Sequence, residues 1–237
     1  MKSLVPRIGF DRCIQHNWAT AALQVRGGLL SLEQLQGLLA EGVEGTDARR
    51  KTLLVLKRLW LEPRAELVDY VTRGAELSKA QPEESPLVWN WGVAIAAYPF
   101  FGKVAELVGR LSDLHGDCTT AEIHRRISEI YGESVGTARS TSRVFQSLES
   151  WGCLERVEKD KRLLRLPTLA VKSDRAVSWL LEGALRYTGK ALGVQTLQAL
   201  AVLYPFTFEQ PLGYLVANSP TLEVQADGSG NLCMALR

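Results

Sequence analysis

The stretch SVGTARSTSRVFQSLESWG (residues 134–152) constrains the fold most, because its polar and apolar residues separate into two faces only when it is wound as a helix. It opens with a serine, which favours helix N-caps, and closes with a glycine, which favours helix ends. At about 100° per residue, Phe145, Leu148 and Trp151 fall in one arc. We expect this apolar arc to pack against the rest of the protein and the opposite arc to be exposed.

The opposite arc carries polar side chains that match the edges of nucleic acid bases. Arg139 and Arg143 lie one turn apart and point the same way. Beside them are Ser140, Ser142 and Gln146. Arginine can bridge two acceptors of guanine or clamp a phosphate, and glutamine can pair with adenine. The same pattern also fits an ordinary solvated helix face, on which two arginines are common.

The residues on either side of this helix give it a recognisable context. The segment TAEIHRRISEIYG predicts a short helix that Thr119 caps together with Glu122. After the long helix, CLERV and RLLRL predict two short strands joined by the charged turn EKDK. This order over residues 117–167 resembles a winged helix-turn-helix domain. The resemblance implies double-stranded DNA binding, with the second helix in the major groove.

Neighbouring elements supply further basic side chains to the same region. The preceding helix carries Arg125 and Arg126, and the hairpin carries Arg156, Lys159, Lys161, Arg162 and Arg165. Residues 119–166 hold nine basic and seven acidic residues, so the basic excess is small. Binding built on phosphate contacts should therefore be moderate and strongly dependent on salt.

The first third of the chain predicts helices broken by glycine and proline. Two apolar-periodic pieces within residues 19–42 are separated by a Gly-Gly pair, and Ser31 is a suitable N-cap for the second. A helix over residues 46–62, capped by Thr46, and another over residues 64–77 follow. The polar segment SKAQPEESP then has the composition of a linker.

Residues 89–114 are apolar over most of their length and predict two helical pieces hinged at Pro99. Core and dimer interface are both open for this region, and we favour either over a ligand pocket.

The tail after Pro167 predicts more helices and a terminal hairpin. The helices are expected over residues 173–187, 194–204 and 210–217. Alternating apolar residues between 222 and 236 surround the turn-forming run DGSGN (residues 227–231), which indicates two strands. Helices followed by a terminal hairpin are compatible with a second winged-helix-like unit, although no segment of the tail predicts a clear recognition helix. We interpret it first as a packing or dimerisation element.

Taken together, these signals predict a mainly α fold with three domains: an N-terminal helical domain over residues 1–77, helices with a winged helix-turn-helix over 78–167, and C-terminal helices with a β-hairpin over 168–237. The formal net charge is +2, so a polyanionic partner must be met by a local patch. The longest apolar segment is too short to span a bilayer and the N-terminus lacks a signal-peptide pattern, so we expect a cytoplasmic protein with no membrane partner. Four dispersed cysteines without CxxC spacing fit reduced thiols.

A second resemblance covers more of the chain. The segments TDARRKTLLVLKRLWLEP, AIAAYPFFGKVAELV and SVGTARSTSRVFQSLESWGCLERV, in this order and spacing, are similar to the BrxA family of BREX phage-defence systems. The resemblance spans about residues 10–166 and implies an N-terminal helical part, a winged-helix part and an association with DNA. Carried over by position, it points to Arg49, Arg50, Thr137, Arg139, Ser140, Thr141 and Arg143. The tail after Pro167 is longer than the resemblance leads us to expect.

Nothing in the sequence carries a familiar catalytic signature, and the three histidines do not form a convincing metal-binding pattern. We therefore predict a non-catalytic protein that binds double-stranded DNA without cofactor or metal, as part of a phage-defence system. Other subunits of a defence complex and a homodimer are possible partners. The alternatives are a transcriptional regulator and a protein-protein scaffold that does not bind DNA.

Overall fold

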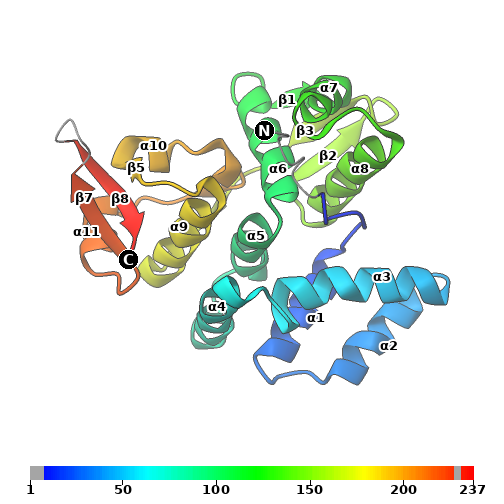
Figure 1. Ribbon diagram of the computed structural model, residues 1–237, viewed down its shortest axis with the longest axis horizontal. Helices are drawn as coiled ribbons and strands as arrows, with labels where there is room; N and C mark the ends of the chain where they lie inside the picture. The colour runs from blue at the N-terminus through cyan, green and yellow to red at the C-terminus, as the bar shows by residue number, and fades with distance from the viewer. Residues whose placement is uncertain (1–7, 227–230) are drawn as a thin grey trace, which may run out of the picture.

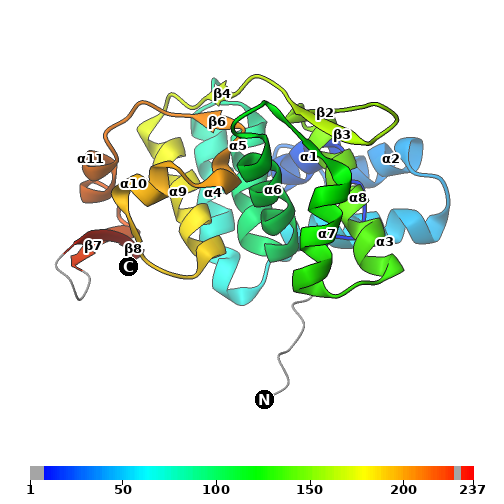
Figure 2. The same ribbon diagram turned by 90° about the horizontal axis from the view of Figure 1, so that it is seen from above.

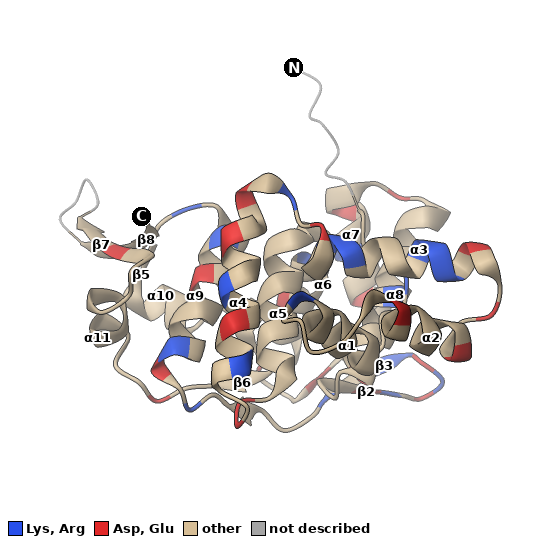
Figure 3. Cartoon of the chain, turned by 90° about the horizontal axis from the view of Figure 1, so that it is seen from below, with Lys and Arg blue, Asp and Glu red and all other residues tan. Residues whose placement is uncertain are grey.

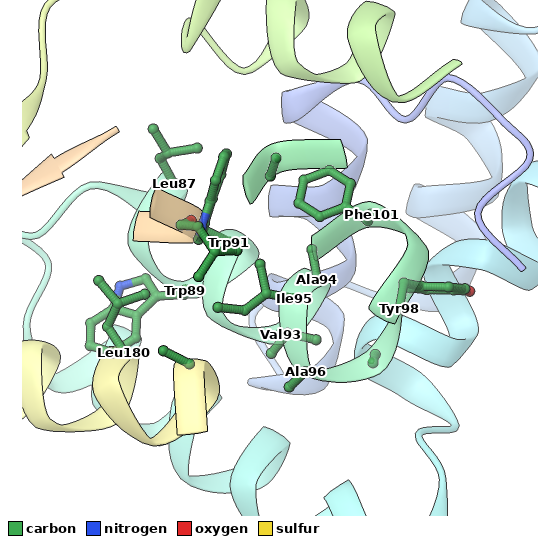
Figure 4. Packing of buried hydrophobic residues seen from close by; sticks show 14 of the residues in the cluster. Leu87, Trp89, Trp91, Val93, Ala94, Ile95, Ala96, Tyr98, Phe101 and Leu180 are labelled. Carbon is green, nitrogen blue, oxygen red and sulfur yellow. The ribbon is translucent and has the colours of Figure 1, made fainter. Parts of the chain in front are cut away.

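Helix α5 (Pro86–Ala97) is apolar on all sides, so it is stable only where every side is covered. Every residue after Pro86 in this helix is buried, and Trp89 and Trp91 have no exposed surface. Figure 4 shows its side chains pointing in different directions into the layers around it. Of the two roles left open for this region, core and dimer interface, the structure shows core for α5.

Helix α6 (Pro99–Ser112) follows α5 after a bend of 116°, which confirms the hinge predicted at Pro99. On its other side α5 packs closely against α9 (Asp174–Thr188). A Cβ on Gly92 would lie 2.3 Å from the ring of Trp179, so the approach of the two helices requires glycine there. Trp179 in turn stacks on Tyr70, with ring centroids 4.4 Å apart.

The N-terminal helices form a layer on one side of α5, as Figure 1 shows. They are α1 (His16–Arg26), α2 (Leu32–Gly42), α3 (Thr46–Leu56) and α4 (Val68–Ala80), with a π-helical turn at Lys57–Leu61 and a 3-10 turn at Ala65–Leu67. Ser31 caps α2 in a reciprocal capping box with Gln34, as predicted. Thr46 was expected to cap α3 and does not: the N-cap is Gly45, whose φ of 82° places the chain in a turn that glycine favours.

Residues 99–165, which we call the central unit, place two helices on a small sheet. After α6 come β1 (Asp117–Thr119), α7 (Thr120–Tyr131), α8 (Val135–Ser150), β2 (Leu154–Val157) and β3 (Arg162–Arg165). The three strands are antiparallel, with β3 between β1 and β2. The predicted short helix, longer helix and charged hairpin are all present in the predicted order.

Residues 174–236, which we call the C-terminal unit, follow the same order of elements. After α9 come β5 (Leu192–Gly193), α10 (Val194–Gln198), α11 (Leu212–Ala217), β7 (Leu222–Ala226) and β8 (Leu232–Leu236). Its strands are again antiparallel, with the last strand, β8, between β5 and β7. Between α10 and α11 the chain adds a 3-10 turn at Ala201–Leu203 and β6 (Phe206–Thr207), which pairs in parallel with β4 (Leu169–Ala170).

Two helices of this unit are shorter than the sequence predicts. The helix expected over residues 194–204 stops at Gln198, because Leu200 is extended before the 3-10 turn. The last helix begins after Pro211 rather than at residue 210, and the proline serves as its N-cap residue. The two strands of the terminal hairpin are confirmed. Residues 227–230 of its predicted turn lie outside the described residues.

The structure is a computed structural model that describes residues 8–226 and 231–237. It is mainly helical with small sheets, and one continuous cluster of buried apolar side chains runs from Phe10 to Met234. Seen from above in Figure 2, the C-terminal unit and α2 lie at opposite ends of an elongated molecule. The predicted division into three domains stays a prediction.

The polar segment SKAQPEESP, predicted as a linker, is bonded to the start of α9 through Glu84. Glu84 is buried and accepts hydrogen bonds from the backbone amides of Lys172 and Ser173, at 2.9 and 2.6 Å. These amides lie at the start of α9, so the carboxylate joins the loop after α4 to the C-terminal unit.

In the described part of the chain no single helix is long and apolar enough to cross a bilayer. Only the bent pair α5–α6 reaches the required length and apolar composition when its two helices are taken together.

Candidate nucleic-acid interface

Helix α8 has two faces, as its sequence predicts. The Ser134 hydroxyl caps its first turn by accepting from the Thr137 amide at 3.0 Å. The predicted anchoring face is confirmed, because Phe145 and Leu148 on the helix and Trp151 just after it are all buried. Gly152 follows with a φ of 70°, the left-handed conformation that ends many helices.

The sequence pattern predicts one edge of the exposed face wrongly. Ser140 was expected to face outward, but only 5% of its surface is exposed, and Ser147 is fully buried. Both lie on the side of α8 where Trp151 points, and the segment before α1 covers that side at Ser147 and Trp151. The residues that the BrxA resemblance adds, Thr137 and Thr141, are buried as well. None of these hydroxyls lies on the exposed surface.

The covering segment is held along α8 by three hydrogen bonds. The Ile14 amide donates to the Ser147 hydroxyl at 2.9 Å, and the Ile14 carbonyl accepts from the Trp151 indole at 2.9 Å. One turn further, the His16 amide donates to the Ser150 hydroxyl at 3.1 Å. These contacts join positions more than 130 residues apart in the chain. No local pattern signals such a contact, because a serine on a helix looks the same whether its partner is water or backbone.

The remaining exposed face keeps the two arginines that motivated the DNA hypothesis. Arg139 is exposed and has no hydrogen bond or ion pair anywhere in the described chain. Arg143 is half-buried and donates to the Gln146 side chain at 2.8 Å, so it is held by a neutral partner. Ser142 lies beside His124 of α7, with 3.5 Å between the hydroxyl oxygen and the ring nitrogen. Val135, at the first turn, has 75% of its surface exposed.

The basic residues of α7 were expected to add to this surface, but their charges are compensated. Arg125 pairs with Glu122 at 2.8 Å and also with Glu129. Arg126 pairs with Glu122 at 2.6 Å. The two guanidinium groups hold the pKa of the Glu122 carboxyl down to about 2, so it stays ionised. Arg125 and Arg126 therefore contribute little net positive potential here.

The hairpin contains both compensated and uncompensated cations. Arg162 pairs with Asp117 of β1 and with Glu158, and Arg156 pairs with Glu149 at 2.7 Å. At the tip, Lys159 and Lys161 are exposed and have no acidic partner among the described residues.

The turn that carries these lysines has an unusual backbone. Glu158, Lys159 and Asp160 have φ values of 52°, 56° and 67° in succession. Such left-handed conformations are uncommon outside glycine.

Arg49 and Arg50 do not join this surface. Both lie on α3, which Figure 1 shows apart from α8. Arg49 donates to the Val43 carbonyl at 2.8 Å, and Arg50 pairs with Asp47 at 2.7 Å. Together with Lys51, Arg50 lowers the pKa of the Asp47 carboxyl to about 2. These two predicted DNA contacts therefore form a separate location, where one of the arginines is already neutralised.

No three histidine, cysteine or acidic side chains gather as metal ligands within the described residues. Comparison with family models, with curated proteins and with solved structures finds no match for this chain. The resemblances to winged-helix domains and to the BrxA family stay predictions.

Proposed function

We propose that the central unit is a winged helix-turn-helix that binds double-stranded DNA, with α8 as its recognition helix and the β2–β3 hairpin as its wing. The observation that carries this proposal is where the uncompensated cations lie. Within the described part of the unit, Arg125, Arg126, Arg156, Arg162 and Arg165 all have carboxylate partners. Four cations on α7, α8 and the hairpin have no carboxylate partner among the described residues. Arg139 and Arg143 lie on the exposed face of α8, and Lys159 and Lys161 lie at the hairpin tip.

The geometry supports a division of labour between helix and wing. The first turns of a recognition helix come nearest the base edges, which favours Val135 and Arg139 as the residues that meet them. An exposed valine can contact a thymine methyl group, and an arginine can bridge the O6 and N7 atoms of guanine. The two wing lysines are suited to phosphates beside the groove. Ser140 and Thr137 support the helix from its buried face and do not contact bases in this proposal.

The proposed role is binding without catalysis. Phage defence follows from the sequence resemblance to the BrxA family, and transcriptional regulation would use the same contacts. The two roles differ in whether binding selects a sequence, since regulators need a large preference for their own site.

A salt-dependent titration with a labelled duplex tests the proposal. Arg139→Ala/Arg143→Ala should weaken binding by about ten- to a hundredfold. The slope of log affinity against log salt should fall by about 1 for each of the two arginines that contacts a phosphate rather than a base. Lys172→Ala/Arg175→Ala is the matched control, because it likewise removes two cations that have no acidic partner in the described chain. We expect the control to bind like the unaltered protein.

Two results would contradict the proposal. The first is absence of binding at low salt by the unaltered protein, which would favour the scaffold hypothesis. The second is equal weakening by both double variants, which would mean that only total charge matters and that α8 has no special part. Circular dichroism of each variant verifies that the loss does not come from unfolding.

A further inference from the structure

Strand β7 ends the sheet of the C-terminal unit, so one of its edges has no partner strand among the described residues. Figure 1 shows β7 at the outer margin of the molecule, with no other element beyond it. An open edge presents unpaired backbone donors and acceptors, which readily pair with another strand.

The register of the hairpin shows which backbone groups face this open edge. The Arg237 amide donates to the Thr221 carbonyl at 3.0 Å, so these two residues form a hydrogen-bonded pair. In an antiparallel ladder such pairs alternate, which makes Glu223 with Ala235 and Gln225 with Cys233 the next ones. The backbone groups of Leu222, Val224 and Ala226 therefore point away from β8, toward the open edge.

The edge carries few of the features that usually prevent strand pairing. Natural edge strands carry charges, especially lysine, or proline and bulges. Strand β7 contains one charged residue, Glu223. The strand at the same place in the central unit, β2, carries both Glu155 and Arg156 and runs into the charged turn. Only three charged residues occur in the whole of residues 191–236, and Figure 3 shows this part of the chain almost without charge.

Exposed apolar side chains continue from the edge onto the face of the sheet. Val224 has 45% and Leu232 63% of its surface exposed. Both side chains belong to the face that also holds the buried Leu222 and Met234, because residues two apart along a strand share a face and paired residues lie side by side. The buried apolar surface of the unit thus extends past its own core to the margin of β7.

We propose that β7 pairs with β7 of a second copy of this chain, antiparallel and centred on Val224, to form a symmetric dimer. In this register Val224 faces its own copy, Leu222 faces Ala226, and Glu223 faces Gln225. The backbone groups at the open edge then meet in three hydrogen-bonded pairs. The one charged residue of each strand lies opposite an amide that can donate to it, so no like charges meet.

A second copy is favoured over another partner because the strand is complementary to itself. Already within one chain the Gln225 side chain donates to the Glu223 carboxylate. The same donor and acceptor would pair across the two-fold axis without rearrangement of the backbone. An isologous contact of this kind closes after two copies, which avoids the open-ended assembly that an uncovered edge otherwise invites. The proposal does not depend on DNA binding, since α8 lies at the other side of the molecule (Figure 1).

Solution mass tests the dimer directly. Sedimentation of the full chain up to about 0.1 mM should show a species of twice the chain mass of 26.2 kDa that dissociates on dilution, as expected for a small interface. Val224→Lys places two like charges at the centre of the pairing and should shift the protein to monomer. Gln195→Lys is the matched control, because it adds the same charge to an exposed site on α10. A monomer throughout, or a dimer that survives Val224→Lys, would overturn the proposal.

Cysteine crosslinking tests the register. In a Cys233→Ser background, which removes the nearby thiol, Val224→Cys should form an interchain disulfide on mild oxidation, because facing residues in such a pair have Cα atoms about 5.5 Å apart. Glu223→Cys is the control, since its counterpart in the second copy lies two positions away along the facing strand. Equal crosslinking of both variants, or crosslinking of Glu223→Cys alone, would rule out pairing centred on Val224.

Discussion

The central unit and the C-terminal unit share one order of elements and differ in what they expose. Each places a helix, a strand, two helices and a hairpin in the same sequence, with the last strand in the middle of its sheet. In the central unit the second helix of the pair, α8, has 16 residues, whereas its counterpart α11 has six. A helix of 16 residues spans about 24 Å and one of six about 9 Å, so only α8 is long enough to lie along a groove and still be anchored.

The surfaces of the two units differ in the same sense. Helix α8 exposes Arg139 and the neighbouring hairpin exposes two lysines, whereas α11 exposes Tyr214 and no charged residue. The same topology therefore offers a polar, charged surface in one place and an uncharged one in the other. A surface without charge cannot attract a polyanion over distance, and it costs little to desolvate against a protein. The comparison teaches that shared topology alone does not assign a function to either unit.

The largest expected effect concerns how the C-terminal unit is attached to the N-terminal layer. Glu182 on α9 is fully buried and accepts from Arg73 at 2.8 and 3.0 Å, from Arg186 at 2.8 Å and from the Thr221 hydroxyl at 2.8 Å. Removal of one partner from a buried ion pair leaves the other charges unpaired, so Glu182→Ala should lower the free energy of unfolding by about 3 kcal/mol.

Urea denaturation measures this loss, and Asp69→Ala is the matched control. Asp69 pairs with the same Arg73, but 80% of its side chain is exposed, so its removal should cost less than about 0.5 kcal/mol. If the two variants lose equal stability, burial of Glu182 is not what makes the network important.

The contact between the two units gives the next effect. Gly109 on α6 packs against the 3-10 turn of the C-terminal unit, and a Cβ at this position would lie 2.1 Å from the Ala201 carbonyl oxygen. Because that atom belongs to the backbone, Gly109→Ala should cost about 2 kcal/mol through overpacking. Gly37→Ala on the exposed side of α2 is the control, since nothing lies near its Cβ and alanine should stabilise the helix slightly. A neutral result for Gly109→Ala would show that the two units adjust freely against each other.

A smaller effect concerns the wing. Lys159→Ala and Lys161→Ala should each weaken DNA binding a few-fold and reduce the salt slope by about 1, because each removes one cation that has no acidic partner in the described chain. Arg126→Ala is the comparison, since Arg126 is already paired with Glu122. The titration with a labelled duplex distinguishes them, and a larger loss for Arg126→Ala would contradict the argument from uncompensated charge.

The sequence predicts the helices of the central unit well because each carries its own start and stop signals. Ser134 and Gly152 bound α8, and the periodicity of its apolar residues identifies the anchored face correctly. The structure buries Ser140 and Ser147 along one edge of the face predicted to be polar, and at Ser147 the cause is non-local, since the Ile14 amide donates to its hydroxyl.

The sequence also could not predict which basic residues of the site have acidic partners. A count of residues treats all nine basic side chains alike, whereas the fold brings Asp117 to Arg162 and Glu149 to Arg156. These partners lie on different elements, so only the arrangement in space shows which cations stay available. In the C-terminal unit the helix predicted over residues 194–204 was too long, because the apolar periodicity of the sequence continues through Leu200, where the helix has already ended.

We expect the two units to differ, last, in their response to acid. The pKa of His16, beside α8, and that of His124, on α7, are both lowered by burial, and residues 168–237 contain no histidine. In the unfolded chain both side chains take up protons at their ordinary pKa of about 6.5, whereas in the folded chain they resist protonation. The stability that comes with their neutral forms is therefore present above that pH and is lost as the pH falls through the lowered values.

Hydrogen exchange at about pH 7.5 and 5.5, corrected for intrinsic rates, should show loss of protection in α8 and the segment before α1, and little change in β7 and β8. His16→Gln/His124→Gln should remove most of this difference, because glutamine does not titrate. Equal loss of protection in both units, or an unchanged difference in the double variant, would show that these two histidines do not cause the acid response. Since the carboxyl of Glu122 has a pKa of about 2, that ion pair on α7 stays intact across this range and cannot supply the effect.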